Sequence, residues 1–138
     1  MILHRVFACI AASAVLTLAG PAGAATDPLA KVRAEFQSAY AAVETAPMDV
    51  DAAGDSEALR KYPLYPYLQA ARLQRRLADP SAAGAIEAFL AEHGSAPAAR
   101  SLRRSWLMTL AMRKAWEPYL AAYREDVDDS VAARCNAL

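Results

Sequence analysis

Helical periodicity interrupted by proline is the feature of this sequence that most constrains its fold. Apolar residues recur at spacings of three and four, and no segment alternates with the two-residue period of a strand. The chain has 138 residues with only 5 glycines, and its abundant alanine, leucine and arginine favour helices. We therefore predict an all-α protein of about six or seven short helices, and the length fits one domain.

The first predicted helix lies within residues 26–46. Thr26 or Asp27 can cap it, and Pro28 suits the first helical position. Five apolar side chains form one stripe, which we interpret as packing surface: Leu29, Val32, Phe36, Tyr40 and Val43.

An acidic segment, PMDVDAAGDS, follows this helix. Three aspartates and a glycine match positions of a calcium-binding loop: Asp49, Asp51, Asp55 and Gly54. Ala53 and Arg60 occupy the fifth and twelfth positions, where the loop needs an oxygen ligand and a bidentate glutamate. We therefore interpret the segment as a solvated linker.

The segment KYPLYPYL places two Tyr-Pro pairs between two helices. Ser56 and Glu57 begin a short helix that Pro63 ends near Tyr62, because the residue before proline is disfavoured in the α region. Pro66 disfavours the α region at Tyr65 in the same way and suits the first turn of the next helix. The segment predicts a tight corner whose tyrosines bury their rings while their hydroxyls reach water or backbone.

The second half of the chain predicts further helices in tandem. Asp79 and Pro80 open one that ends at Gly94, and the next begins near Pro97. Predicted apolar positions of these two helices are Ile86, Phe89, Leu90, Leu102, Trp106 and Leu110. A short helix with Pro118 in its first turn follows, and the last is capped by Asp128, Asp129 or Ser130. Tandem helix pairs predict an α-superhelix or solenoid, truncated at its C-terminal end because nothing follows the last helix.

Residues 1–24 predict a secretory signal peptide. Arg5 precedes an apolar stretch, Gly20 and Pro21 end it, and Ala22 and Ala24 fit a small-residue cleavage site. The apolar run is short for the roughly 20 residues of a membrane span, so we expect no stable membrane insertion after cleavage. Residues 25–138 then form the mature chain.

The mature chain has a single cysteine, Cys135. In an oxidising compartment a lone thiol is unusual. We therefore treat Cys135 as a disulfide candidate whose partner lies in sequence beyond Leu138.

Few residues fit an active site, a metal site or a cofactor site. The formal net charge is +0, which argues against nucleic-acid binding by bulk electrostatics. His93 and Cys135 are too few for a metal site and lack a third group for nucleophilic catalysis. No cofactor motif occurs. Glu57, Glu87 and Glu117 lie near predicted helix starts, where the helix dipole favours carboxylates.

Arginines cluster in the helix that begins near Pro97, at Arg100, Arg103 and Arg104. They are either an anion-contacting strip or a solvated face. We assign no catalytic residue.

Two stretches carry a resemblance to a known family. EALRKYPLYPYLQAARLQRRL closely resembles the Tyr-Pro-Leu-Tyr-Pro-Tyr segment of soluble lytic murein transglycosylases, and FLAEHGSAPAARSLRRSWLMTLAMRKAWEPYLAAY resembles the stretch that follows. DDSVAARCNAL is similar to the family's continuation, including a cysteine at the matching place. The residues that match the family motif as structural positions are Tyr62, Pro63, Leu64, Tyr65, Pro66, Tyr67, Leu68 and Trp106.

The resemblance implies a periplasmic protein of peptidoglycan metabolism. Such enzymes cleave the β-1,4 bond between N-acetylmuramic acid and N-acetylglucosamine, and a single glutamate leaves a 1,6-anhydromuramyl end. A long α-superhelical ring precedes their lysozyme-like domain. This chain matches only the start of the ring and lacks the Glu-Ser and Gly-Leu-Met-Gln motifs.

We therefore expect a non-catalytic N-terminal superhelical segment that meets peptidoglycan glycan strands through the complete enzyme. The alternative is a stand-alone helical-repeat adaptor that binds a protein or peptide in the cell envelope.

Overall fold

The fold is all-α, as the sequence predicts. The computed structural model describes residues 27–45, 54–94 and 96–138, in which every regular element is a helix. The predicted signal peptide, Thr26, Asp49 and Asp51 lie outside these ranges. The helices are α1 (Ala30–Thr45), α2 (Glu57–Arg60), α3 (Tyr65–Arg75), α4 (Ala83–His93), α5 (Pro97–Met112), α6 (Trp116–Ala122) and α7 (Val131–Asn136), with a 3₁₀ turn at Pro80–Ala82.

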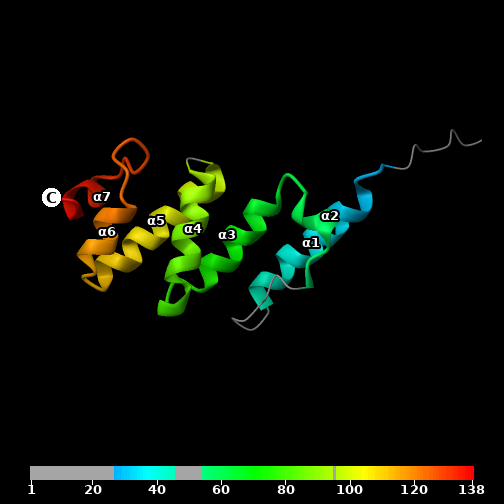
Figure 1. Cartoon of the computed structure of the whole chain (residues 1–138), viewed down its shortest axis with the longest axis horizontal. Helices are drawn as coiled ribbons and strands as arrows, with labels where there is room; N and C mark the ends of the chain where they lie inside the picture. The colour runs from blue at the N-terminus through cyan, green and yellow to red at the C-terminus, as the bar shows by residue number, and fades with distance from the viewer. Residues whose placement is uncertain (1–26, 46–53, 95) are drawn as a thin grey trace, which may run out of the picture.

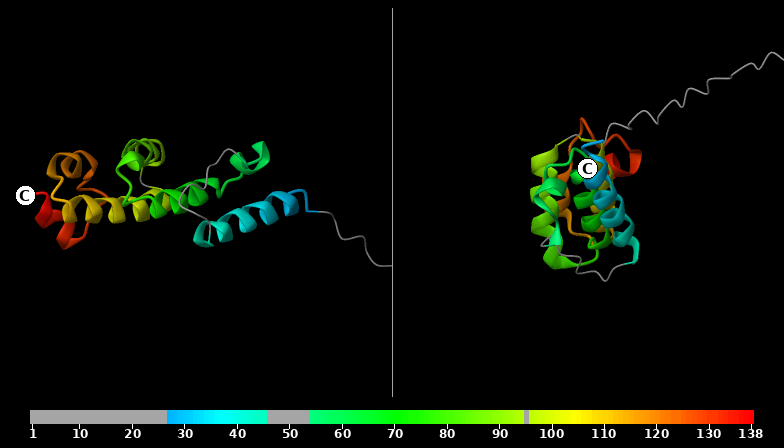
Figure 2. Two further views of the ribbon diagram at one scale, coloured as in Figure 1. Left: turned by 90° about the horizontal axis from the view of Figure 1, so that it is seen from below. Right: turned by 90° about the vertical axis from the view of Figure 1, so that its right-hand side faces the viewer.

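The helices follow one another along the long axis of the molecule (Figure 1). α1 and α2 lie at one end and α6 and α7 at the other, while α3 and α5 run through the middle (Figure 2). α5 packs against α3, α4, α6 and α7, and α3 also packs against α1. This order fits a tandem array of helices. A superhelical path stays a prediction.

Two apolar clusters hold the array together. The larger lies among α3, α4, α5 and α6, with Ile86, Leu102 and Trp106 almost fully buried. The smaller lies among α1, α2 and α3, around Leu59 and Leu68. Burial of each such side chain contributes about 1.5–3 kcal/mol, so the helices are held chiefly by their shared faces.

The predicted stripe of α1 is only partly packing surface. Val32 and Val43 are buried, and the ring of Phe36 lies 5.5 Å from that of Tyr62. Leu29 and Tyr40 are 48% and 43% exposed. Leu29 lies before the first residue of α1, and Tyr40 lines an open hollow between α1, α3 and α5.

The predicted helix ends are confirmed at several positions. Ser130 Oγ accepts from the backbone N–H of Ala133 at 3.1 Å, which selects it from the three candidate caps of α7. Asp79 Oδ1 accepts from the N–H of Ser81 at 2.9 Å, ahead of the turn that leads into α4. Gly94 ends α4 with φ 51°, a conformation that costs glycine little. None of the described helices has the length and apolarity needed to cross a membrane.

Candidate functional site

The Tyr-Pro corner is built around a partly buried ion pair. Arg72 in α3 donates from Nη2 to Asp55 Oδ1 at 2.9 Å and from Nη1 to Oδ2, a bidentate pair. The side chains of Arg72 and Asp55 are only 11% and 7% exposed. Tyr65, at the start of α3, donates its hydroxyl to Asp55 Oδ2 at 2.9 Å. Asp55, just before α2, is thus fixed to α3 at two points.

Charge and burial act on these groups in identifiable directions. The hydrogen bond from Arg72 lowers the pKa of Asp55 below its ordinary 3.8, against the effect of burial, and the Tyr65 hydroxyl adds to the lowering. Burial raises the pKa of Tyr65, and its bond to Asp55 raises it further. Asp55 is therefore a structural carboxylate, engaged by Arg72 and Tyr65.

The other residues of the family-like segment divide between core and surface. Leu68 is fully buried, whereas Leu64 and Tyr67 are 43% and 41% exposed. Pro66 lies in the first turn of α3, as predicted, but the helix already begins at Tyr65. The predicted corner is therefore present, and its tyrosines have three different environments.

Ser56 connects α1 to the same corner. Its Oγ accepts from the N–H of Leu59 at 3.1 Å as the cap of α2, and donates to Glu35 Oε2 at 2.8 Å. Its backbone N–H donates to Glu35 Oε1 at 3.2 Å. One serine thus satisfies a helix end and makes a contact between helices.

We expect Ser56→Ala to lower the free energy of unfolding by about 1–2 kcal/mol, because a cap and an interhelical bond are lost together. Urea denaturation followed by circular dichroism measures it. Ser130→Ala, which removes only a local cap, is the matched control and should cost less. Equal losses in the two variants would contradict a contribution from Glu35.

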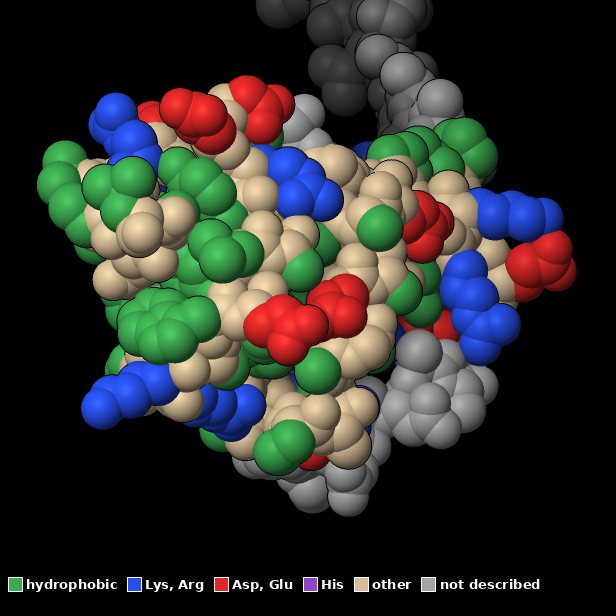
Figure 3. Space-filling view, turned by 60° about the vertical axis from the view of Figure 1, so that its left-hand side comes forward, with side chains coloured by type: hydrophobic (Ala, Val, Ile, Leu, Met, Phe, Trp, Pro, Cys, Tyr) green, Lys and Arg blue, Asp and Glu red, His purple; other side chains and the backbone are tan. Residues whose placement is uncertain are grey.

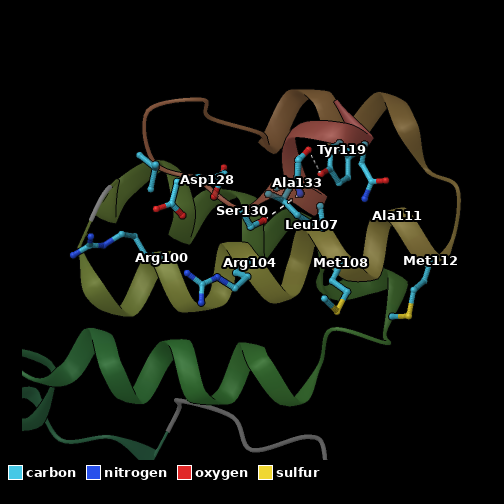
Figure 4. A pocket seen from close by; sticks show the side chains of 14 residues that line it. Arg100, Arg104, Leu107, Met108, Ala111, Met112, Tyr119, Asp128, Ser130 and Ala133 are labelled. Atoms are coloured by element: carbon cyan, nitrogen blue, oxygen red, sulfur yellow. Dashed lines mark hydrogen bonds between the residues drawn. The ribbon is translucent and has the colours of Figure 1, made fainter. Parts of the chain in front are cut away.

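A second candidate surface is a groove between α5 and α7. It encloses about 440 Å³ and is closed at one side by the loop before α7 (Figure 4). α5 contributes Arg100, Arg104, Leu107, Met108, Ala111 and Met112; the loop and α7 contribute Val127, Asp128, Asp129, Ser130, Ala132, Ala133 and Asn136; and α6 contributes Tyr119. Its size is typical of a binding groove, and its lining combines charged and apolar side chains.

The predicted arginine cluster does not lie on one face. Arg100 and Arg104 are exposed and line the groove. Arg103 is only 4% exposed and donates from Nη2 to the carbonyl of Gly94 at 3.1 Å, so it joins α5 to the end of α4. The hypothesis that all three arginines form one anion-contacting strip is therefore wrong. Arg100 and Arg104 remain exposed and could contact an anionic partner.

The remaining candidates do not converge. His93 ends α4 with its ring 4.3 Å from that of Phe89, and Cys135 is exposed on α7. Glu57, Glu87 and Glu117 are all exposed. Among the described residues, no three His, Cys, Asp or Glu side chains are placed to hold a metal ion.

Exposed apolar side chains gather over the C-terminal end of the molecule (Figure 3). They belong to the last three helices and the terminal residue: Met108, Met112, Trp116, Leu120, Val131 and Leu138. Sequence reasoning placed no binding surface here. No local pattern could have found it, because its residues come from three helices that only the fold brings together.

Comparison of the chain with protein-family models, curated proteins and solved structures finds no match.

Proposed function

We propose that this chain is the non-catalytic N-terminal α-superhelical segment of a periplasmic lytic murein transglycosylase, whose complete form cleaves glycan strands to 1,6-anhydromuramyl products. The observation that carries the proposal is the segment Tyr62–Leu68, which resembles the family's Tyr-Pro segment and forms the joint between α2 and α3. The joint connects two helices of a tandem array, and the resemblance implies that such an array forms the start of the family's superhelical ring. Peptidoglycan strands are the proposed partner, through the complete enzyme.

The carboxylates of the described chain support a scaffold role. A glycosidic-bond acid needs a carboxyl group in a partly apolar cleft that raises its pKa. Glu57, Glu87 and Glu117 are exposed instead, and the buried Asp55 has its pKa lowered by Arg72. We infer that catalysis belongs to another part of the complete protein.

A direct test is to incubate the purified chain with peptidoglycan sacculi and analyse the soluble products by mass spectrometry. We expect no 1,6-anhydromuropeptides, because the chain lacks the Glu-Ser motif that carries the catalytic glutamate in the family it resembles. A known lytic transglycosylase is the positive control. Release of anhydromuropeptides by the chain alone would contradict a non-catalytic role.

The family itself is tested at the DNA level. Sequencing downstream of the Leu138 codon should reveal an in-frame Glu-Ser and Gly-Leu-Met-Gln pattern. A stop followed by unrelated sequence would reject the transglycosylase proposal. It would leave the second candidate, a helical-repeat adaptor in the cell envelope, which the groove between α5 and α7 favours.

A further inference from the structure

One ridge runs along the outer face of α5, beside the groove. Arg100, Arg104, Met108 and Met112 follow one another at intervals of four residues, and all four are exposed (Figure 4). Side chains at such spacing form one of the ridges by which helices pack, inclined about 26° to the helix axis. The ridge changes from cationic to apolar along its length.

The cationic end of the ridge consists of two arginines. Among the described residues no hydrogen bond or ion pair involves the side chain of Arg100 or Arg104, although Arg72, Arg76 and Arg33 each pair with an aspartate. Guanidinium groups bind carboxylates in a bidentate manner, and two of them one helical turn apart match carboxylates at the same spacing. The cationic end is therefore complementary to acidic side chains on a helix.

The apolar end is suited to aliphatic side chains. Met108 and Met112 are 61% and 74% exposed, an unusual exposure for two neighbouring apolar residues. Methionine is flexible and adapts to the shape of a partner. Across the groove, α7 presents Ala132 and Ala133, whose small side chains let a partner backbone approach.

The opposite wall restricts how the partner is oriented. Asp128 is buried and accepts from the backbone N–H of Arg124 at 2.8 Å, whereas Asp129 is exposed. Carboxylates of a partner are therefore repelled from the loop side and attracted to the α5 side. A helix with acidic residues confined to one face satisfies both conditions.

We propose that the groove between α5 and α7 docks an amphipathic helix of a partner protein. Two acidic residues of that helix, one turn apart, lie over Arg100 and Arg104, and aliphatic residues of its next two turns lie over Met108 and Met112. This inference goes beyond the proposed transglycosylase scaffold, because it assigns a protein partner to a surface to which that proposal gives none.

The test uses a labelled synthetic helix of about 16 residues with two glutamates one turn apart, then leucines at the next two turns. Fluorescence anisotropy measures its binding to the whole chain at low salt. We expect saturable binding to the wild type and a loss of about tenfold or more with the double variant Arg100→Glu/Arg104→Glu. A matched peptide with lysines in place of the glutamates should show the reverse preference.

Control variants separate docking from general charge effects. Lys31→Glu changes an exposed charge on α1 and should leave peptide affinity unchanged. Met108→Ala/Met112→Ala should weaken the glutamate peptide without reversing its charge preference. Circular dichroism checks that each variant remains folded. Failure of the glutamate peptide to saturate below about 1 mM, or a charge preference that the arginine reversal leaves unchanged, overturns the proposal.

Discussion

Arg72→Met is expected to lower the free energy of unfolding by about 3–5 kcal/mol, because it leaves the Asp55 carboxylate buried without its cation. The Asp55 side chain is 7% exposed, and Arg72 makes two hydrogen bonds to it. The pair fixes the segment before α2 to α3, so its loss loosens the contact of α1 and α2 with the rest of the molecule. Urea denaturation at neutral pH, followed by circular dichroism, measures the change.

Two further variants identify the cause of this loss. Tyr65→Phe removes only the hydroxyl that donates to Asp55 and should cost about 1.5–3 kcal/mol. Asp55→Asn/Arg72→Met removes both charges and should cost less than the sum of the single variants, the sign of direct coupling. Strict additivity would show that the two charges do not stabilise each other.

The pH dependence follows from the lowered pKa of Asp55. A carboxyl group whose folded pKa lies below its unfolded value of 3.8 contributes stability above that value and loses it as the pH falls through the folded pKa. The stability difference between the wild type and Asp55→Asn should therefore be largest near neutral pH and shrink below about pH 4. A constant difference from pH 7 to pH 3 would exclude the ion pair as its source.

Local signals in the sequence predicted the helices well. Ser56 and Ser130 cap the starts of α2 and α7 with their side chains, and Gly94 ends α4, as their residue types predict. These signals depend on a few neighbouring residues, which explains their success. The partner of Asp55 was missed because Arg72 lies 17 residues away, beyond any local pattern.

A weaker signal for the partly buried Arg72 and the buried Arg103 was nevertheless present. Arg72 follows the buried residues Tyr65 and Leu68 at helical spacing, and Arg103 lies between Ala99 and Trp106 in the same way. An arginine on an apolar stripe needs a buried acceptor. Arg72 finds the carboxylate of Asp55, and Arg103 finds the carbonyl of Gly94.

The groove could not be predicted from the same periodicity. The sequence alone predicts a solvated face of one helix for Arg100, Arg104, Met108 and Met112. Only the structure shows that α7 and the loop before it lie beside this face of α5. That placement depends on tertiary contacts, such as the hydrogen bond of 2.8 Å from the Tyr119 hydroxyl to the carbonyl of Ala133. Surfaces shared by distant segments are therefore the part of this molecule that needs the structure.

Trp106 is the second position at which a single substitution should have a large effect. It is 1% exposed, in the centre of the larger apolar cluster, and its helix α5 contacts four other helices. Trp106→Ala should lower the free energy of unfolding by about 3–5 kcal/mol through lost burial and the cavity left behind. In a small domain that is enough to leave much of the protein unfolded, so the urea midpoint and the far-ultraviolet spectrum are both measured.

The two tryptophans of the chain provide a matched comparison. Trp116 is 47% exposed, so Trp116→Ala should change stability by about 0.5 kcal/mol or less. Trp106→Phe should cost much less than Trp106→Ala, because it keeps most of the ring and removes a buried indole N–H that has no hydrogen-bond partner among the described residues. If Trp106→Ala and Trp116→Ala both lowered the free energy of unfolding by only about 0.5 kcal/mol, α5 would not be the element that joins the two ends of the array.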